Sequence, residues 1–158
     1  MEIRNRGRIL EIQDARIIYR NFEGRADKYN REGDRNFAIV IPDQDICNQL
    51  VEDGWNVRIR DPREGYEDPF MFLPVKVHYS DNGRGPAAYV NSGGNVTRLS
   101  EETIGMLDNI DIFSVDLDIR PYDWNINGDT GRKAYLEAIH VTQKIDRFGA
   151  MYAAEDML

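Results

Sequence analysis

Apolar side chains recur at every second residue over most of this chain, and that alternation restricts the fold to one built mainly from β-strands. Residues 115–120, Val-Asp-Leu-Asp-Ile-Arg, are the clearest example. Helical spacing is limited to two short stretches, one between Asp43 and Gly54 and one from Ser100 to Met106. The pattern predicts a mainly β protein with one or two short helices.

The expected strands follow one another without the long helices that alternate with strands in parallel sheets. They cover residues 8–20, 36–42, 55–60, 70–80, 88–91, 115–120 and 134–143. The alternation in the first of them shifts phase near Asp14, as a β-bulge or a barrel bend would require. The last two are joined by a glycine-containing hairpin connection, Asn125–Gly131. This arrangement favours a small antiparallel β-barrel.

Neither a repeat nor a linker divides the 158 residues, so we expect one domain over residues 1–147 and a tail or short helix over 148–158. The single cysteine, Cys47, excludes an internal disulfide and a multi-cysteine zinc site, and we expect it to be a buried structural thiol. The apolar runs are far shorter than the roughly 20 residues of a membrane helix, and the N-terminus has no signal-peptide core. We therefore expect a cytoplasmic protein without a membrane partner.

The charge of the chain is acidic overall but unevenly distributed. The 28 acidic and 20 basic side chains leave a net charge of -8, which by itself argues against a polyanionic partner. Residues 1–35, however, have a net charge of +2, and the remainder has a net charge of -10. Because exposed charges are screened over roughly 8 to 10 Å in physiological salt, a local cationic groove can still bind nucleic acid.

A search for catalytic motifs finds little. His78 and His140 have no Cys or carboxylate at metal-ligand spacing, so we interpret both as structural. Nucleophile-elbow, Walker and dinucleotide-binding motifs are absent from the sequence. We expect a protein that is not an enzyme and that needs no metal or cofactor.

A stronger signal is the long segment between the first two expected strands, residues 20–35, which combines cations, amides and aromatic side chains. Single-stranded nucleic acid requires this combination, because cations follow the phosphates while aromatic rings stack on the bases. The candidate phosphate contacts are Arg16, Arg20, Arg25, Lys28, Arg31 and Arg35, with Arg58, Arg60 and Arg120 in a second group. The candidate stacking residues are Tyr19, Phe22, Tyr29, Tyr122 and Trp124, whereas Phe37 and Trp55 are expected in the core.

Several segments resemble bacteriophage single-stranded DNA-binding proteins with an OB fold. Residues 115–122, 125–131 and 133–141 are similar to the closing hairpin of that group, and residues 36–42 with the following short helix are similar to its early part. The resemblance implies an OB-like antiparallel β-barrel and sequence-independent binding of single-stranded DNA in phage replication or recombination, without metal or cofactor.

The end of the chain, residues 153–158, is similar to the acidic-apolar terminal peptides with which many such proteins recruit replication enzymes. That resemblance implies replication or recombination enzymes as further partners, and a homodimer is also compatible with the sequence. An amphipathic helix packed on the barrel is the alternative interpretation of this end.

Two other functions stay open at this point. The 28 carboxylates could belong to an acidic interaction protein that mimics DNA and blocks a host nuclease. Alternatively, Asp116, Asp118 and Asp123 could hold Mg²⁺ in a metal-dependent nuclease, since alternate residues of a strand share a face.

Overall fold

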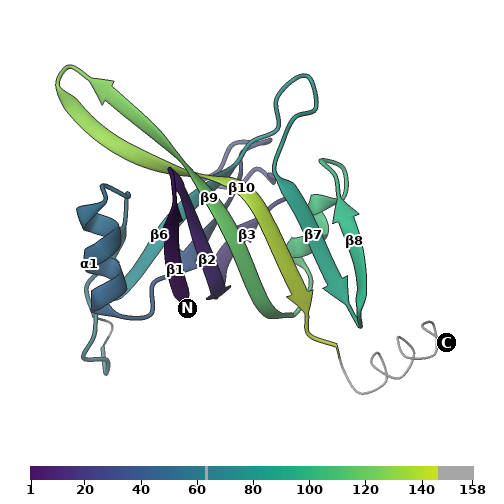
Figure 1. The fold of residues 1–158 in the computed structure, drawn as a ribbon, viewed down its shortest axis with the longest axis horizontal. Helices are drawn as coiled ribbons and strands as arrows, with labels where there is room; N and C mark the ends of the chain where they lie inside the picture. Colours follow the sequence, from purple (N-terminus) through teal and green to yellow (C-terminus); the bar gives the residue numbers. More distant parts are fainter. Residues whose placement is uncertain (63, 146–158) are drawn as a thin grey trace.

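The computed structural model describes residues 1–62 and 64–145 as ten strands, one α-helix and one 3₁₀-helix (Figure 1). The strands are β1 (Glu2–Arg6), β2 (Ile9–Ala15), β3 (Ile17–Asn21), β4 (Arg35–Val40), β5 (Arg58–Arg60), β6 (Phe70–Val77), β7 (Ala87–Ser92), β8 (Asn95–Leu99), β9 (Ile112–Ile126) and β10 (Asp129–Gln143). The helices are α1 (Gln44–Glu52) and η1 (Ile104–Asp108). The mainly β class is confirmed. The tail or helix expected over 148–158 lies outside the described residues and stays a prediction, as does the domain boundary at 147.

All ten strands belong to one hydrogen-bonded sheet, whose main order is β1-β2-β9-β10-β6-β4-β3. Neighbours along this order are antiparallel except β10 and β6, and β10 also pairs in parallel with β7. This corrects the purely antiparallel expectation. The reason is the length of β10: its 15 residues accommodate β6 and then β7 along one edge, and the chain runs in the same direction through both.

The predicted bend near Asp14 is present. Asp14 has a φ of 53°, and the pairing of β2 with β9 shifts register between Ile12 and Ala15. Only Arg16 separates β2 from β3, and its carbonyl accepts a hydrogen bond from the Val40 amide at 2.9 Å. The chain therefore passes from the β9 side of the sheet to the β4 side through one bulged segment.

The core lies on one face of this sheet, as the period-two alternation predicts. Along β6, for example, Met71, Leu73, Val75 and Val77 are buried. Phe37, Trp55 and Cys47 are buried as expected.

The helix α1 begins where the sequence predicts, because the Asp43 side chain accepts a hydrogen bond from the Ile46 amide at 2.9 Å. Gly54, at φ 89°, follows the helix in the left-handed conformation that favours glycine. Among the described residues, none of the helices is long and apolar enough to span a membrane.

Some element boundaries differ from the sequence-based expectation. Strands β1 and β8 were not expected, because their side chains are mostly exposed and show no alternation between core and solvent. Strands β9 and β10 extend to Ile126 and Asp129, so the connection is the two-residue turn Asn127-Gly128 rather than Asn125–Gly131. Both turn residues have positive φ, 52° and 88°, as a type I′ hairpin requires. Of the third expected strand, only the last three residues form a strand, β5. The second expected helix is a 3₁₀-helix and starts at Ile104 rather than at Ser100.

Candidate nucleic-acid interface

The outward side of β5 and β6 presents aromatic rings beside arginines. Arg58 and Arg60 of β5 lie opposite Phe72 and Phe70 of β6, so all four side chains share a face of the sheet. The two phenylalanine rings lie 5.5 Å apart, and the Arg60 guanidinium lies 5.7 Å from the centre of the Phe72 ring. We call these four residues the strand face.

Tyr19 extends the strand face across the sheet to β3. Its ring meets Phe72 edge-on, with centroids 5.7 Å apart, and the residue is 60% exposed. The φ of 53° at Tyr19 coincides with a register shift between β3 and β4, so the bulge turns this side chain outward. Tyr19 also lines a groove of about 620 Å³ that continues into the segment between β3 and β4.

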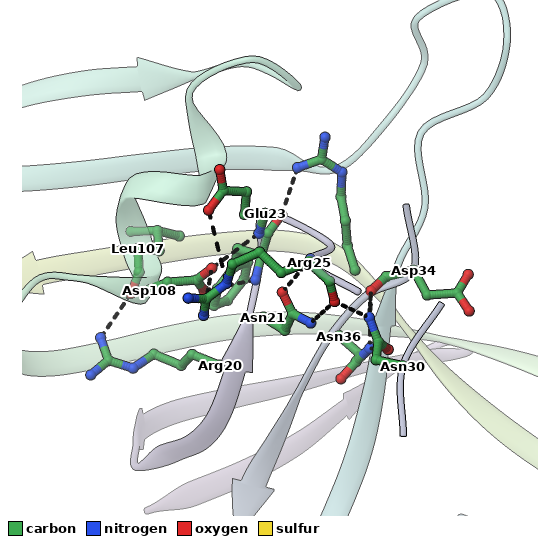
Figure 2. Close-up of polar contacts among 11 residues, drawn as sticks. Arg20, Asn21, Glu23, Arg25, Asn30, Asp34, Asn36, Leu107 and Asp108 are labelled. Atoms are coloured by element: carbon green, nitrogen blue, oxygen red, sulfur yellow. Dashed lines mark hydrogen bonds and ion pairs between the residues drawn. The ribbon is translucent and has the colours of Figure 1, made fainter. Parts of the chain in front are cut away.

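That segment, residues 22–34, is held in a defined conformation by polar contacts (Figure 2). Asn21 Oδ1 accepts from the Arg25 amide at 2.9 Å, and Asn30 Nδ2 donates to the carbonyls of Arg25 and Asp34. Asn36 Nδ2 donates to Asn30 Oδ1 at 2.9 Å. The asparagine amides of this region therefore shape the groove wall.

The Asp108 carboxylate attaches the start of this segment to η1. Its side chain is almost fully buried and accepts hydrogen bonds from the amides of Phe22, at 2.7 Å, and Glu23, at 3.1 Å. Arg25 Nη2 approaches the same carboxylate at 3.9 Å. Figure 2 shows Asp108 between Arg20 and Glu23, facing Arg25.

Phe22 does not occupy the predicted stacking position. It is 0% exposed and stacks on Phe37, with ring centroids 4.9 Å apart and planes 20° apart. Phe22 is therefore a core residue, and its prediction as a base-stacking side chain is wrong. Its position next to polar residues in the sequence suggested exposure, but Phe22 is the first residue of the segment and its side chain points into the core.

Two of the predicted phosphate contacts, Arg20 and Arg35, donate hydrogen bonds to backbone carbonyls. Arg20 Nη1 donates to the carbonyls of Leu107 and Ile110, both at 2.7 Å. Arg35 Nη1 donates to the Phe22 carbonyl, and its guanidinium lies 5.5 Å from the centre of the Tyr79 ring. Arg20 still lines the groove, whereas these contacts hold Arg35 against the body of the sheet.

The remaining candidates of the segment, and Arg16 between β2 and β3, are exposed. Tyr29 lines the groove, and Lys28 Nζ lies 5.6 Å from the centre of its ring. Arg31 and Arg16 are exposed, and neither side chain has an acidic partner among residues 1–62 and 64–145. Of these four residues only Tyr29 lines the groove, whereas Arg16 lines a separate pocket together with Asp14 and Asp111.

The other aromatic candidates lie on the β9–β10 hairpin, whose turn end projects beyond the rest of the molecule (Figure 1). Tyr122 is 52% exposed, and its ring centroid is 5.8 Å from that of Tyr135 on β10. Trp124 is only partly exposed. Arg120 lies 5.1 Å from the centre of the Tyr135 ring and 3.3 Å from a carboxylate oxygen of Glu137, which offsets part of its charge.

Sequence reasoning missed four residues of this surface: Phe70, Phe72, Lys76 and Tyr135. Lys76 lies beside Tyr135 in the parallel pairing of β6 and β10, so the outward face continues from β6 to the hairpin. The signal was available for β6, because its even-numbered residues alternate with the buried ones. The sequence does not show that β10 lies next to β6, so the continuation of this face to Tyr135 could not be predicted.

The three aspartates of the nuclease hypothesis do not converge. Asp116 and Asp118 alternate with the buried Val115, Leu117 and Ile119, whereas the odd-numbered Asp123 lies on the other side of the strand. Asp123 accepts hydrogen bonds from Arg8 and Arg132, and Asp116 accepts one from the Asp14 amide. Burial raises the pKa of Asp118, and the nearby Glu11 adds to that rise. Within the described part of the chain, His, Cys, Asp and Glu form no group suited to a metal ion.

Comparison with solved structures finds the single-stranded DNA-binding protein of bacteriophage Enc34. Its C-terminally truncated form gives a TM-score of 0.54 at 12% identity, over 88% of this chain and 87% of that chain. The same phage protein in complex with single-stranded DNA gives a TM-score of 0.51 at 12% identity, over 89% of each chain. At this identity the likeness concerns the fold. No curated protein sequence matches the chain.

A family model described as a putative phage ssDNA-binding domain matches residues 2–157, which is nearly the entire sequence. The chain therefore belongs to the family of putative phage ssDNA-binding domains.

Proposed function

We propose that this protein binds single-stranded DNA without sequence preference, with the strand face and the neighbouring groove as its main contact surface. The observation that supports this most is the direct contact between Tyr19 and Phe72, with Arg60 over the same ring. Rings at the sheet surface offer stacking for any base, and arginines beside them contact the phosphates on either side.

The strand would cross several elements in sequence. It would enter the groove near Tyr29, Lys28 and Arg31, pass Tyr19, and continue over Phe72 and Phe70 between Arg58 and Arg60. Arg20 and Arg25 would line the groove wall, where Arg25 has part of its charge offset by Glu23 and Asp108. Arg16, Arg120, Tyr122 and Trp124 would extend the contact at its two ends.

In this proposal the sheet is an OB-like barrel that is partly open. The support is the bulged passage through Arg16, which connects the β9 side of the sheet to the β4 side. The strand order from β2 through β9, β10, β6 and β4 would then end at β3, which follows β2 directly in the chain. Curvature of this kind would place the strand face and groove on one outer surface.

The biological setting we propose is the replication or recombination of phage DNA in the host cytoplasm, without enzymatic activity of the chain itself. Family membership supports the phage setting. Recruitment of replication or recombination enzymes through residues 148–158, and formation of a homodimer, are parts of the proposal that require separate measurement.

Titration of fluorescently labelled oligo-dT with the full chain, at low and then high salt, tests the function. We expect saturable binding at micromolar protein in low salt and weaker binding as salt increases. Absence of binding at low-micromolar protein in low salt would contradict it and favour an acidic interaction protein. Degradation of the DNA in the presence of Mg²⁺, if Asp118→Ala abolished it, would instead support a nuclease.

A further inference from the structure

The β9–β10 hairpin has two faces of different chemistry beyond the point where the sheet ends. The register pairs Tyr122 with Lys133 and Trp124 with Gly131, so these four residues share one face. Asp123 and Arg132 form the next pair on the other face. We call residues 120–135 the arm and the side with Tyr122 and Trp124 its front.

On the front, Trp124 lies directly over Gly131. A Cβ atom added to Gly131 would come within 2.4 Å of Cζ2 and 2.5 Å of Cε2 of the indole, which is far inside van der Waals contact. Gly131 has no positive φ that would explain a glycine here by backbone conformation. The missing side chain therefore has a packing consequence: it allows the indole to lie against the β10 backbone.

The back of the arm is fixed to the body of the protein. Arg132 Nε donates to Asp123 Oδ1 at 2.7 Å and Nη1 donates to the Asp53 carbonyl at 2.9 Å, while its guanidinium lies 5.4 Å from the centre of the Trp55 ring. Arg8 Nη2 donates to Asp123 Oδ2 at 2.8 Å. The contacts of Arg132 with Asp53 and Trp55, and of Arg8 with Asp123, hold the arm at the C-terminal end of α1, so its front has a defined orientation.

Tyr122 and Trp124 are two residues apart on one face of β9, about 6.6 to 6.8 Å along the strand, so their side chains are neighbours. Because the indole of Trp124 lies against the β10 backbone, one of its faces is covered and the other is open to a base. Lys133, which is exposed opposite Tyr122, has no acidic partner among the described residues and can contact the phosphate between the two bases.

We propose that the front of the arm binds two successive nucleotides, with Tyr122 and Trp124 stacking on the bases, and that Gly131 is the positioning residue that holds Trp124 flat. This inference rests on the proposed function and extends the DNA contact beyond the strand face. The remaining exposed apolar side chain of the arm, Ile126, lies beyond Trp124 at the turn and marks its end.

The test compares Gly131→Ala with Trp124→Ala and with the double variant, using labelled oligo-dT in low salt. We expect Gly131→Ala to weaken binding about 5- to 150-fold, the range for loss of one stacked base. In the Trp124→Ala background the same substitution should have no further effect. Thr130→Ala is the matched control, because Thr130 is exposed on the back of the arm and should bind DNA normally.

Tryptophan fluorescence provides a second measurement. Trp55 is only 5% exposed, so fluorescence quenching on addition of DNA reports mainly on Trp124. Quenching should be strong in the natural protein and reduced in Gly131→Ala. Unchanged affinity of Gly131→Ala, or an equal loss in the Trp124→Ala background, would overturn the inference while leaving the proposed function intact. Failure of the natural protein to bind oligo-dT would overturn both.

Discussion

Phe72 has a central place in the candidate interface, because Tyr19 and Phe70 lie against its ring and Arg60 lies over it. It is intermediate in burial, so its ring packs against these neighbours and also presents part of its surface to solvent. Its removal should therefore reduce DNA binding and also lower stability.

We expect Phe72→Ala to weaken binding of oligo-dT by about 1 to 3 kcal/mol, because one base loses its stacking ring. Fluorescence anisotropy of labelled oligo-dT would measure the change. Val96→Ala is the control: Val96 is an exposed apolar residue of β8, which pairs with β7 rather than with β5 or β6. An equal loss of affinity in both variants would contradict the assignment of the strand face.

Asp108 is the residue on which the conformation of the groove wall depends. We expect Asp108→Ala to lower the free energy of unfolding by about 1 to 3 kcal/mol, because the amides of Phe22 and Glu23 lose a charged acceptor. Urea denaturation would measure this. Asp34→Ala, an exposed acid of the same segment, should leave stability nearly unchanged. If both variants unfold like the natural protein, Asp108 does not hold the segment.

The arm is the element whose position depends most on a few polar contacts. Asp123 pairs with Arg132 within the arm and with Arg8 outside it. The hydrogen bond from Arg132, together with the charges of Arg132 and Arg8, holds the pKa of Asp123 below its usual value. A carboxylate with a lowered pKa contributes stability at pH values above its unfolded pKa. That contribution is lost as the pH falls through the lowered pKa in the folded protein.

We therefore expect the arm to loosen in acid, at a pH below the ordinary range for an aspartate. Hydrogen exchange of the amides in residues 120–135, followed from pH 6 downward and corrected for the intrinsic exchange rate, would show it. In Asp123→Asn the arm should already be looser at pH 6 and respond less to acid. Asp129→Asn, at the turn end of β10, is the control. Equal protection in the natural protein and Asp123→Asn would contradict this role.

At the scale of the whole molecule, the acidic and cationic surfaces occupy different regions of one sheet. Glu11, Asp116 and Asp118 line a groove of about 330 Å³ where β2 and β9 meet. The cations and rings of the strand face lie on β5 and β6, beyond β10. The net charge of -8 therefore does not describe the potential at the candidate interface.

This separation predicts weak and salt-sensitive binding. If three or four phosphates are neutralised, log K should fall against log salt with a slope of about -2 to -3, at roughly 0.7 per phosphate for single strands. Arg60→Ala should make the slope less negative by about 0.7. Arg4→Ala is the control, because Arg4 pairs with Glu11 on the acidic side of the sheet. The assignment of Arg60 would be wrong if both variants changed the slope equally.

The sequence alone determined the features that depend on neighbouring residues. Alternation predicted most of the strands, Asp43 predicted the start of α1, and the phase shift predicted the bulge at Asp14. These features follow from local geometry, since a strand has a period of two and a helix needs a cap. The resemblance to phage proteins also led to the family, because it relied on the order of such segments.

Tertiary structure determined which residues meet. A period of two divides a strand into two faces, but burial of a loop residue such as Phe22 depends on packing between distant segments. The same is true of Tyr19 beside Phe72 and of Lys76 beside Tyr135. Contacts between residues far apart in the chain form only when the strand order and the register are set. One alternating sequence pattern is compatible with many strand orders and registers.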